Sequence, residues 1–130
     1  MGSVGVMERR LNQRILIQAS AVVTTEDGVR TKMVAVDVSS VGLGVECHTR
    51  QRNMITPGGS FVHDGKPVSV VVDLNLPDDA LSANIVARCH VVFSRRISSD
   101  QCKIGLRYAD IGKDDHERLI RFIEKTLQSV

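Results

Sequence analysis

Three arginines near the start of the chain could bind an anionic ligand. Arg9 and Arg10 are adjacent, and Arg14 follows four positions after Arg10 in a segment without strand-like alternation. The planar guanidinium group forms paired hydrogen bonds with phosphate oxygens and with the acceptor edge of guanine. Considered alone, such a group more often forms a solvated basic segment, so a second feature is needed to indicate a binding site.

A second group of residues, Asp37, Ser39 and Gly42, lies where one strand-like segment gives way to the next. A carboxylate can accept hydrogen bonds from N1–H and the exocyclic amine of guanine, and a hydroxyl can contact a phosphate or a base. Glycine within a strand permits close approach of a ligand. Asp, Ser and Gly are also common turn residues, so this group by itself is compatible with an ordinary turn.

The elements that must position these residues are short strands. Apolar side chains alternate with polar ones, or form short runs, in six segments: 15–23, 29–38, 41–47, 68–74, 83–93 and 102–108. A period of two is typical of half-buried strands. Asp27-Gly28 predicts a hairpin turn, and the polar stretch 48–60, with its Pro and Gly residues, is expected to be a loop.

The last segment, 114–128, changes to a helical period. Asp114 is a candidate N-cap, and Glu117 follows three positions later to complete a capping box. The apolar stripe of this helix consists of Leu119, Ile120, Phe122, Ile123 and Leu127. Short strands followed by one amphipathic helix predict a mainly β fold. We expect a small antiparallel β-barrel, closed or nearly closed, with the C-terminal α-helix packed on it.

Composition limits the possible partners. The 130 residues carry 17 Lys and Arg against 15 Asp and Glu, a net charge of +2, and only 3% are aromatic. Proteins that bind DNA or RNA usually have a larger basic excess and more aromatic platforms, so we expect no nucleic-acid partner. Because no apolar run is long enough to span a bilayer and no signal peptide is apparent, we also expect no membrane insertion.

The three cysteines, Cys47, Cys89 and Cys102, follow no disulfide pattern, which favours a reducing cytoplasm. Two of them precede a histidine, but adjacent strand residues point to opposite faces and make a poor zinc site. We therefore expect no metal, and thiols packed in the core. Cys89, Ser39 or His63 could supply a nucleophile or a base, yet no motif orders them, so we expect no enzyme activity.

The two polar groups occur in an order and spacing that resembles the paired motifs of the PilZ domain family. These motifs are Arg10-x-x-x-Arg14 before the first strand and Asp37-x-Ser39-x-x-Gly42 after the second. The rest of the sequence also resembles the family, and the resemblance covers about Glu8 to Leu127. It includes the break Asn75-Leu76-Pro77, the strand Lys103-Ile104-Gly105-Leu106-Arg107-Tyr108 and the C-terminal helix.

The resemblance, together with the lack of any pattern before Met7, predicts a domain organisation. Residues 1–7 would be a flexible tail or an expression remnant, and residues 8–130 a single PilZ-like domain. That domain would consist of a ligand-binding arm (8–14), a six-stranded barrel (15–109) and the C-terminal helix (114–128).

The resemblance also implies a ligand, the bacterial second messenger cyclic di-GMP. Arg10 and Arg14 would grip its phosphates and guanine edges, while Asp37, Ser39 and Gly42 would seat its other side on the barrel. Arg9 would stack on a guanine or help to hold a second ligand molecule.

No output module of the kind fused to many relatives is apparent. We therefore expect a stand-alone, non-enzymatic receptor with no cofactor, whose arginine arm becomes ordered on cyclic di-GMP and signals to an effector protein. Charge-assisted hydrogen bonds can offset the entropy of ordering the arm. Two alternatives are a PilZ-like interaction adaptor that binds no nucleotide and a small-barrel nucleic-acid binder, the latter disfavoured by the scarcity of aromatic residues.

Overall fold

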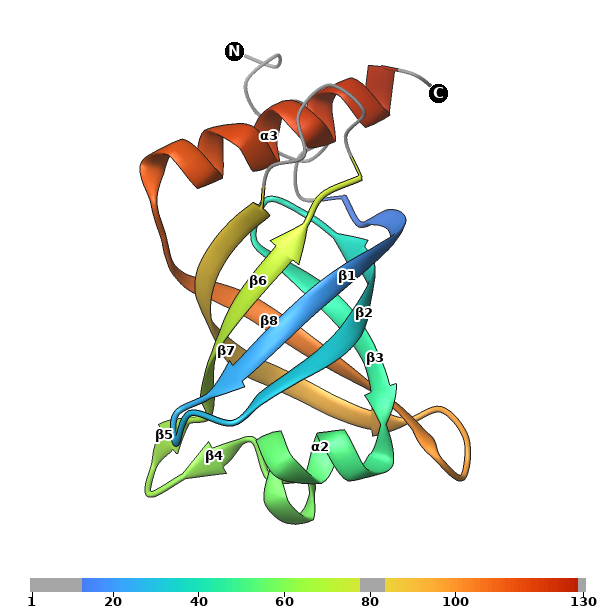
Figure 1. Cartoon of the computed structure of the whole chain (residues 1–130), viewed down its shortest axis with the longest axis vertical. Coiled ribbons are helices and arrows are strands. Elements are labelled where there is room, and N and C mark those ends of the chain that lie inside the picture. Colours follow the sequence, from blue (N-terminus) through green and yellow to red (C-terminus); the bar gives the residue numbers. More distant parts are fainter. Residues whose placement is uncertain (1–12, 78–83, 129–130) are drawn as a thin grey trace.

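The computed structural model describes residues 13–77 and 84–128, and a closed β-barrel forms its centre (Figure 1). Six antiparallel strands close in the order β1-β2-β3-β8-β7-β6. Their bounds are β1 Ile15–Thr25, β2 Arg30–Val38, β3 Gly42–His48, β6 Ser69–Asn75, β7 Asn84–Arg96 and β8 Gln101–Ile111. The predicted mainly β class and the six-stranded barrel are confirmed.

Apolar side chains of alternate strand residues fill the barrel. Many are small: Ala21, Ala35 and Val45 have no exposed surface. Small and β-branched side chains suit the narrow interior of a six-stranded barrel, where facing strands are close together. The thiols of Cys47, Cys89 and Cys102 are also buried, which confirms their predicted place in the core.

Strand β1 is held unequally along its length. Its pairing with β2 contains a register shift between Leu16 and Ala19. Its pairing with β6 runs only from Ala21 to Thr25, opposite Val70 to Leu74. Among the described residues, the first half of β1 therefore has backbone pairing with β2 alone, while its Ile15 and Ala19 pack into the core.

The C-terminal helix α3 (Lys113–Gln128) crosses one end of the barrel (Figure 1). Leu119, Phe122 and Ile123 of its predicted stripe are buried and join the barrel core. Burial of this apolar face therefore attaches the helix to the barrel, as the helical period predicts.

The start of α3 differs from the prediction. The backbone N–H of His116 donates to the carbonyl of Gly112 at 2.9 Å, so the first turn closes before Asp114. The prediction of Asp114 as N-cap is wrong, because this residue lies inside the first turn. Its negative charge still interacts favourably with the helix N-terminus. Strand β8 likewise continues past residue 109 to Ile111.

The stretch 48–60 is not a loop, and that prediction is wrong. It forms helix α2 (Thr49–Ile55) and a 3₁₀ turn, η1 (Pro57–Gly59). The imidazole of His48 accepts from the backbone N–H of Arg50, and the Gln51 side chain accepts from the N–H of His48 at 2.8 Å. This capping arrangement satisfies amides that a helix start leaves unpaired.

The end of the barrel opposite α3 carries the smaller elements. Helix α2 and the two-stranded sheet of β4 (Val62–His63) and β5 (Lys66–Pro67) lie there together (Figure 1). Among the described helices, none has the length and apolar character that crossing a bilayer requires.

Candidate ligand-binding site

Asp37 is the centre of a small cluster of charged side chains. Its carboxylate is 8% exposed and lies near the end of β2. Nη1 of Arg14 donates to Oδ1 at 3.1 Å, and Nζ of Lys103 donates to Oδ2 at 2.7 Å. A buried carboxylate is stable only when charged partners compensate its lost hydration, and here two cations do so.

Strand order explains how these residues meet. Arg14 directly precedes β1, whose Leu16 pairs with Asp37 of β2. Asp37 pairs in turn with Gly44 of β3, and the next strand, β8, contributes Lys103. Three neighbouring pairings of the closed barrel therefore bring together residues that lie 23 and 66 positions apart.

Two glycines of β3 leave space that this arrangement needs. A Cβ atom at Gly44 would lie 2.8 Å from both carboxylate oxygens of Asp37 and from Cε of Lys103. A Cβ at Gly42 would lie 2.1 Å from the backbone oxygen of Leu106. Gly44 thus makes room for the ion pair, while Gly42 permits close contact between the β3 and β8 backbones.

Ser39 shapes the turn between β2 and β3. Its side chain is fully buried, accepts from the backbone N–H of Val41 at 3.2 Å and donates to the carbonyl of Gly42 at 3.4 Å. The hydroxyl of Tyr108 donates to the carbonyl of Ser39 at 3.3 Å. Burial raises the pKa of Tyr108 above its ordinary value, so this donor keeps its proton at neutral pH.

The structure brings together four of the six residues predicted from the sequence. Arg14 and Asp37 are in direct contact, and Ser39 and Gly42 form the adjoining turn. Arg9 and Arg10, with the rest of the arm before residue 13 and the whole predicted tail, lie outside the described residues. The ligand contact predicted for each of the six stays a prediction.

Sequence reasoning missed two residues that support Asp37 and its turn. Lys103 holds the second carboxylate oxygen, and Tyr108 holds the turn through the carbonyl of Ser39. Both lie on β8, in the segment 103–108 that contributes to the family resemblance. Their roles depend on which strand becomes the neighbour of β3, and alternation along the chain carries no information about that.

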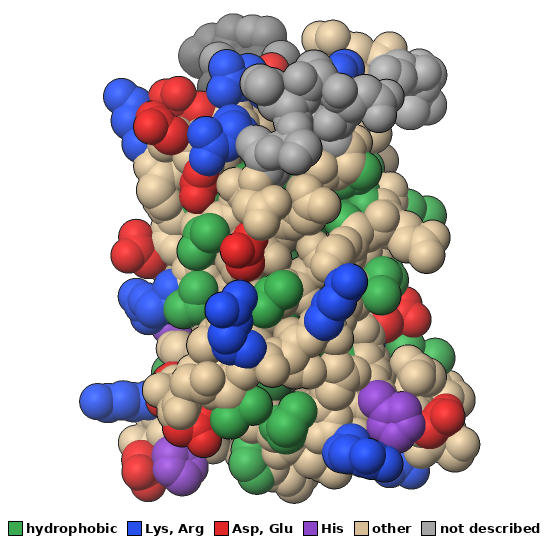
Figure 2. All heavy atoms as spheres, viewed as in Figure 1, with side chains coloured by type: hydrophobic (Ala, Val, Ile, Leu, Met, Phe, Trp, Pro, Cys, Tyr) green, Lys and Arg blue, Asp and Glu red, His purple; other side chains and the backbone are tan. Residues whose placement is uncertain are grey.

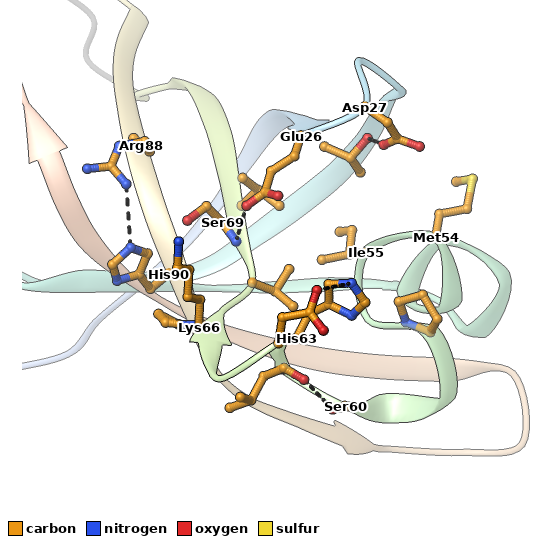
Figure 3. Close-up of a pocket in the computed structure, with 17 residues that line it drawn as sticks. Glu26, Asp27, Met54, Ile55, Ser60, His63, Lys66, Ser69, Arg88 and His90 are labelled. Atoms are coloured by element: carbon orange, nitrogen blue, oxygen red, sulfur yellow. Dashed lines mark hydrogen bonds and ion pairs between the residues drawn. The ribbon is translucent and has the colours of Figure 1, made fainter.

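A separate cavity of about 810 Å³ lies at the opposite end of the barrel, by α2 and the β4–β5 sheet (Figure 3). Arg88, His90 and Lys66 lie on one side of it, and Met54 and Ile55 of α2 on the other. None of the described residues in the Asp37 cluster lines this cavity, so the two features are distinct.

Charged side chains do not form a single patch on the face shown in Figure 2. Basic and acidic groups are interspersed there, with hydrophobic side chains between them. The described part of this face therefore presents no continuous basic track of the kind that follows a polynucleotide backbone.

Solved structures share this fold at low sequence identity. MotI (DgrA), the inhibitor of motility of Bacillus subtilis, is 18% identical with a TM-score of 0.65, over 89% of this chain and 50% of that chain. The PilZ domain of Escherichia coli YcgR, solved with c-di-GMP, is 12% identical with a TM-score of 0.56, over 90% of each chain.

PlzA of Borreliella burgdorferi, solved in complex with c-di-GMP, is 7% identical with a TM-score of 0.58. The alignment covers 98% of this chain and 57% of PlzA, so this chain spans only about half the length of MotI and PlzA. At these identities the likeness shows the fold alone.

Comparison of the amino-acid sequence gives the family. No curated protein sequence matches the chain. The model of the PilZ domain matches residues 8–125, which include both polar motifs and most of α3. The chain therefore belongs to the PilZ domain family.

Proposed function

We propose that this protein is a non-enzymatic receptor for cyclic di-GMP. The observation that carries the proposal is the contact between the two motifs, in which Arg14 Nη1 lies 3.1 Å from Asp37 Oδ1 across 23 positions of sequence. Family membership and the c-di-GMP complexes of YcgR and PlzA support the choice of ligand.

The charged cluster provides both kinds of group that the ligand needs. Asp37 accepts hydrogen bonds from a guanine, because its two oxygens match the adjacent N1–H and amine donors. Arg14, whose side chain is 43% exposed, moves from Asp37 to the ligand phosphates and guanine edges. Arg9 and Arg10 add guanidinium groups from the same arm, and Ser39 with Gly42 holds the turn beneath the ligand.

Binding converts the arm of residues 8–14 into part of the site, and this is the signal. Residues 8–130 act as one domain, with the tail 1–7 outside it. A segment that becomes ordered presents a new surface, and an effector protein recognises that surface. The entropy lost by the arm is offset by charge-assisted hydrogen bonds to the phosphates.

Titration calorimetry with cyclic di-GMP tests the proposal. Arg14→Ala and Asp37→Ala should each weaken binding by about 2–5 kcal/mol, because each leaves a partly buried charge without its partner. Arg118→Ala is the matched control, since Arg118 pairs with Asp115 within α3, and it should bind as the wild type does. Circular dichroism verifies that each variant is folded. A folded wild-type chain that gives no heat overturns the proposal.

One observation favours a second candidate, a PilZ-like adaptor that binds no nucleotide. Asp37 already has two cationic partners and little exposed surface, so the cluster is complete as a structural ion pair. The adaptor predicts that a protein partner is retained equally with and without cyclic di-GMP, whereas the receptor predicts that the nucleotide changes retention.

A further inference from the structure

We infer that Lys103 is a specificity-determining residue of this site, which donates a hydrogen bond to O6 of the guanine held by Asp37. This inference rests on the proposed function and adds to it a residue outside the two motifs. It names the base edge that the site reads, the Watson–Crick edge of guanine.

The order of polar atoms in the cluster is the first argument. Nζ of Lys103 lies 2.7 Å from Oδ2 of Asp37, and Nη1 of Arg14 lies 3.1 Å from Oδ1. Once Arg14 turns to a phosphate, the site presents a donor followed by two acceptors: Nζ, Oδ2 and Oδ1. The Watson–Crick edge of guanine presents the complementary order, with O6 as acceptor and N1–H and the amine as donors.

The two cations differ in how freely they can leave the carboxylate. The Lys103 side chain is 20% exposed, whereas that of Arg14 is 43% exposed. Arg14 also belongs to the segment before β1, while Lys103 lies within a strand paired on both sides. Lys103 therefore stays beside Asp37, and its ammonium group has donors to spare for O6 because it carries three.

The same atoms disfavour adenine. Its amine would face the Lys103 donor, and its N1 acceptor would face the Asp37 carboxylate, so neither hydrogen bond could form. A site that leaves polar groups unpaired against the wrong base rejects it strongly. Asp37 and Lys103 thus discriminate between cyclic di-GMP and cyclic di-AMP. The attraction of the arginines for phosphates is the same for both ligands and does not contribute to this discrimination.

Gly44 leaves the space that Asp37 and Lys103 occupy. Both oxygens of Asp37 and Cε of Lys103 lie within 2.8 Å of the position a Cβ would take there. The absence of that atom leaves room for the carboxylate and the ammonium group next to each other, with Nζ 2.7 Å from Oδ2.

Calorimetry with three ligands tests the inference: cyclic di-GMP, cyclic di-AMP and a cyclic di-GMP analogue in which sulfur replaces O6 of both guanines. Sulfur is a weak acceptor, so the wild type should bind the analogue about tenfold less tightly than cyclic di-GMP. It should bind cyclic di-AMP at least about 100-fold less tightly than cyclic di-GMP. Lys103→Met should weaken cyclic di-GMP binding about 10- to 100-fold.

The decisive comparison is how much the sulfur substitution weakens binding to the wild type and to Lys103→Met. In Lys103→Met the sulfur substitution should weaken binding several-fold less than it does in the wild type, because the Lys103 donor to O6 is gone and only arginine contacts with the guanine edges still respond to sulfur. Lys103→Gln, which keeps a neutral N–H donor, should retain part of the sulfur effect and guards against poor folding of the Met variant. Lys66→Met, on β5 at the other end of the barrel, is the control and should behave as the wild type.

The outcomes separate this inference from the proposed function. A wild type that binds cyclic di-GMP, together with an equal sulfur effect in wild type and Lys103→Met, overturns the inference and leaves the receptor intact. In that case Lys103 only positions Asp37. A wild type that binds none of the three ligands overturns the receptor and the inference together.

Discussion

At the scale of single residues, the glycines of β3 determine how closely the site can pack. Gly42 lies against backbone, which is held by the β3–β8 pairing and has little freedom to move. Gly44 lies against the ends of two side chains, which can move if the ion pair gives way. The same substitution at these neighbouring positions should therefore have different consequences.

We predict that Gly42→Ala mainly reduces stability, by about 1–3 kcal/mol or more, because its methyl group would overlap the carbonyl oxygen of Leu106. Urea denaturation measures this loss. Gly112→Ala is the control, since a Cβ there meets no atom within 4 Å, and it should cost less than about 1 kcal/mol. Equal losses in the two variants would contradict the close contact between β3 and β8.

Gly44→Ala should instead mainly weaken ligand binding. The added methyl group displaces the Asp37 carboxylate from Lys103, so we expect a loss of about 1–3 kcal/mol in binding free energy with a smaller loss of stability. Parallel calorimetry and urea denaturation compare the two quantities. A Gly44→Ala variant that is strongly destabilised yet binds cyclic di-GMP as the wild type does would contradict this prediction.

The sequence could indicate which residues lie together where short motifs contain them. Arg14, Asp37, Ser39 and Gly42 belong to two compact patterns, and the structure places them together. Lys103 has no such pattern, because 66 positions separate it from Asp37 and it lies in an ordinary alternating strand. Its contact depends on β8 becoming the neighbour of β3, which is a property of the closed barrel.

At the scale of elements, helix α2 shows how a short polar segment acquires structure. Only Ile55 of its residues is buried, and its cap is a histidine, which is not among the usual N-cap residues. The strands and α3 could be predicted because their periods are long and clear. Helix α2 could not be predicted, because seven residues with one buried side chain show no helical period. Its formation depends on contacts with strands that lie far away in the sequence.

Gln51 joins α2 to β2 through side-chain hydrogen bonds. Its side-chain N–H donates to the Thr31 hydroxyl and to the Lys32 carbonyl, both at 2.7 Å, while its oxygen accepts from His48. We predict that Gln51→Ala lowers the free energy of unfolding by about 1–2 kcal/mol, through loss of these hydrogen bonds. Asn53→Ala, an exposed position of the same helix, should be nearly neutral in the same urea titration. Similar losses would show that α2 is not held through Gln51.

At the scale of the whole molecule, the buried thiols link folding to alkaline pH. Burial raises the pKa of Cys89 to about 12, and burial together with the neighbouring Cys102 raises that of Cys47 to about 11. Above about pH 9 the unfolded chain releases these protons while the folded chain keeps them. The folded state then binds more protons than the unfolded state, so stability falls as the pH rises.

We therefore predict a loss of stability between about pH 9 and pH 11, with each thiol contributing up to about 1.4 kcal/mol per pH unit. Urea midpoints measured at intervals across this range test it. Tyr108, whose pKa burial also raises, adds to the decline above about pH 10. Cys89→Ala should show a shallower decline, since one of the three shifted groups is removed. A stability that stays constant across the range would contradict the burial of the thiols.

The uneven attachment of β1 has a mechanical consequence. From Ala21 onward the strand is joined to β2 and β6, whereas among the described residues its first half is joined to β2 alone, across a register shift. The half nearest Arg14 therefore has fewer backbone hydrogen bonds to resist displacement, while Ile15 and Ala19 anchor it in the core. A displacement of Arg14 then strains only a few backbone hydrogen bonds to β2. When Arg14 is displaced, the other strand pairs of the barrel keep their register.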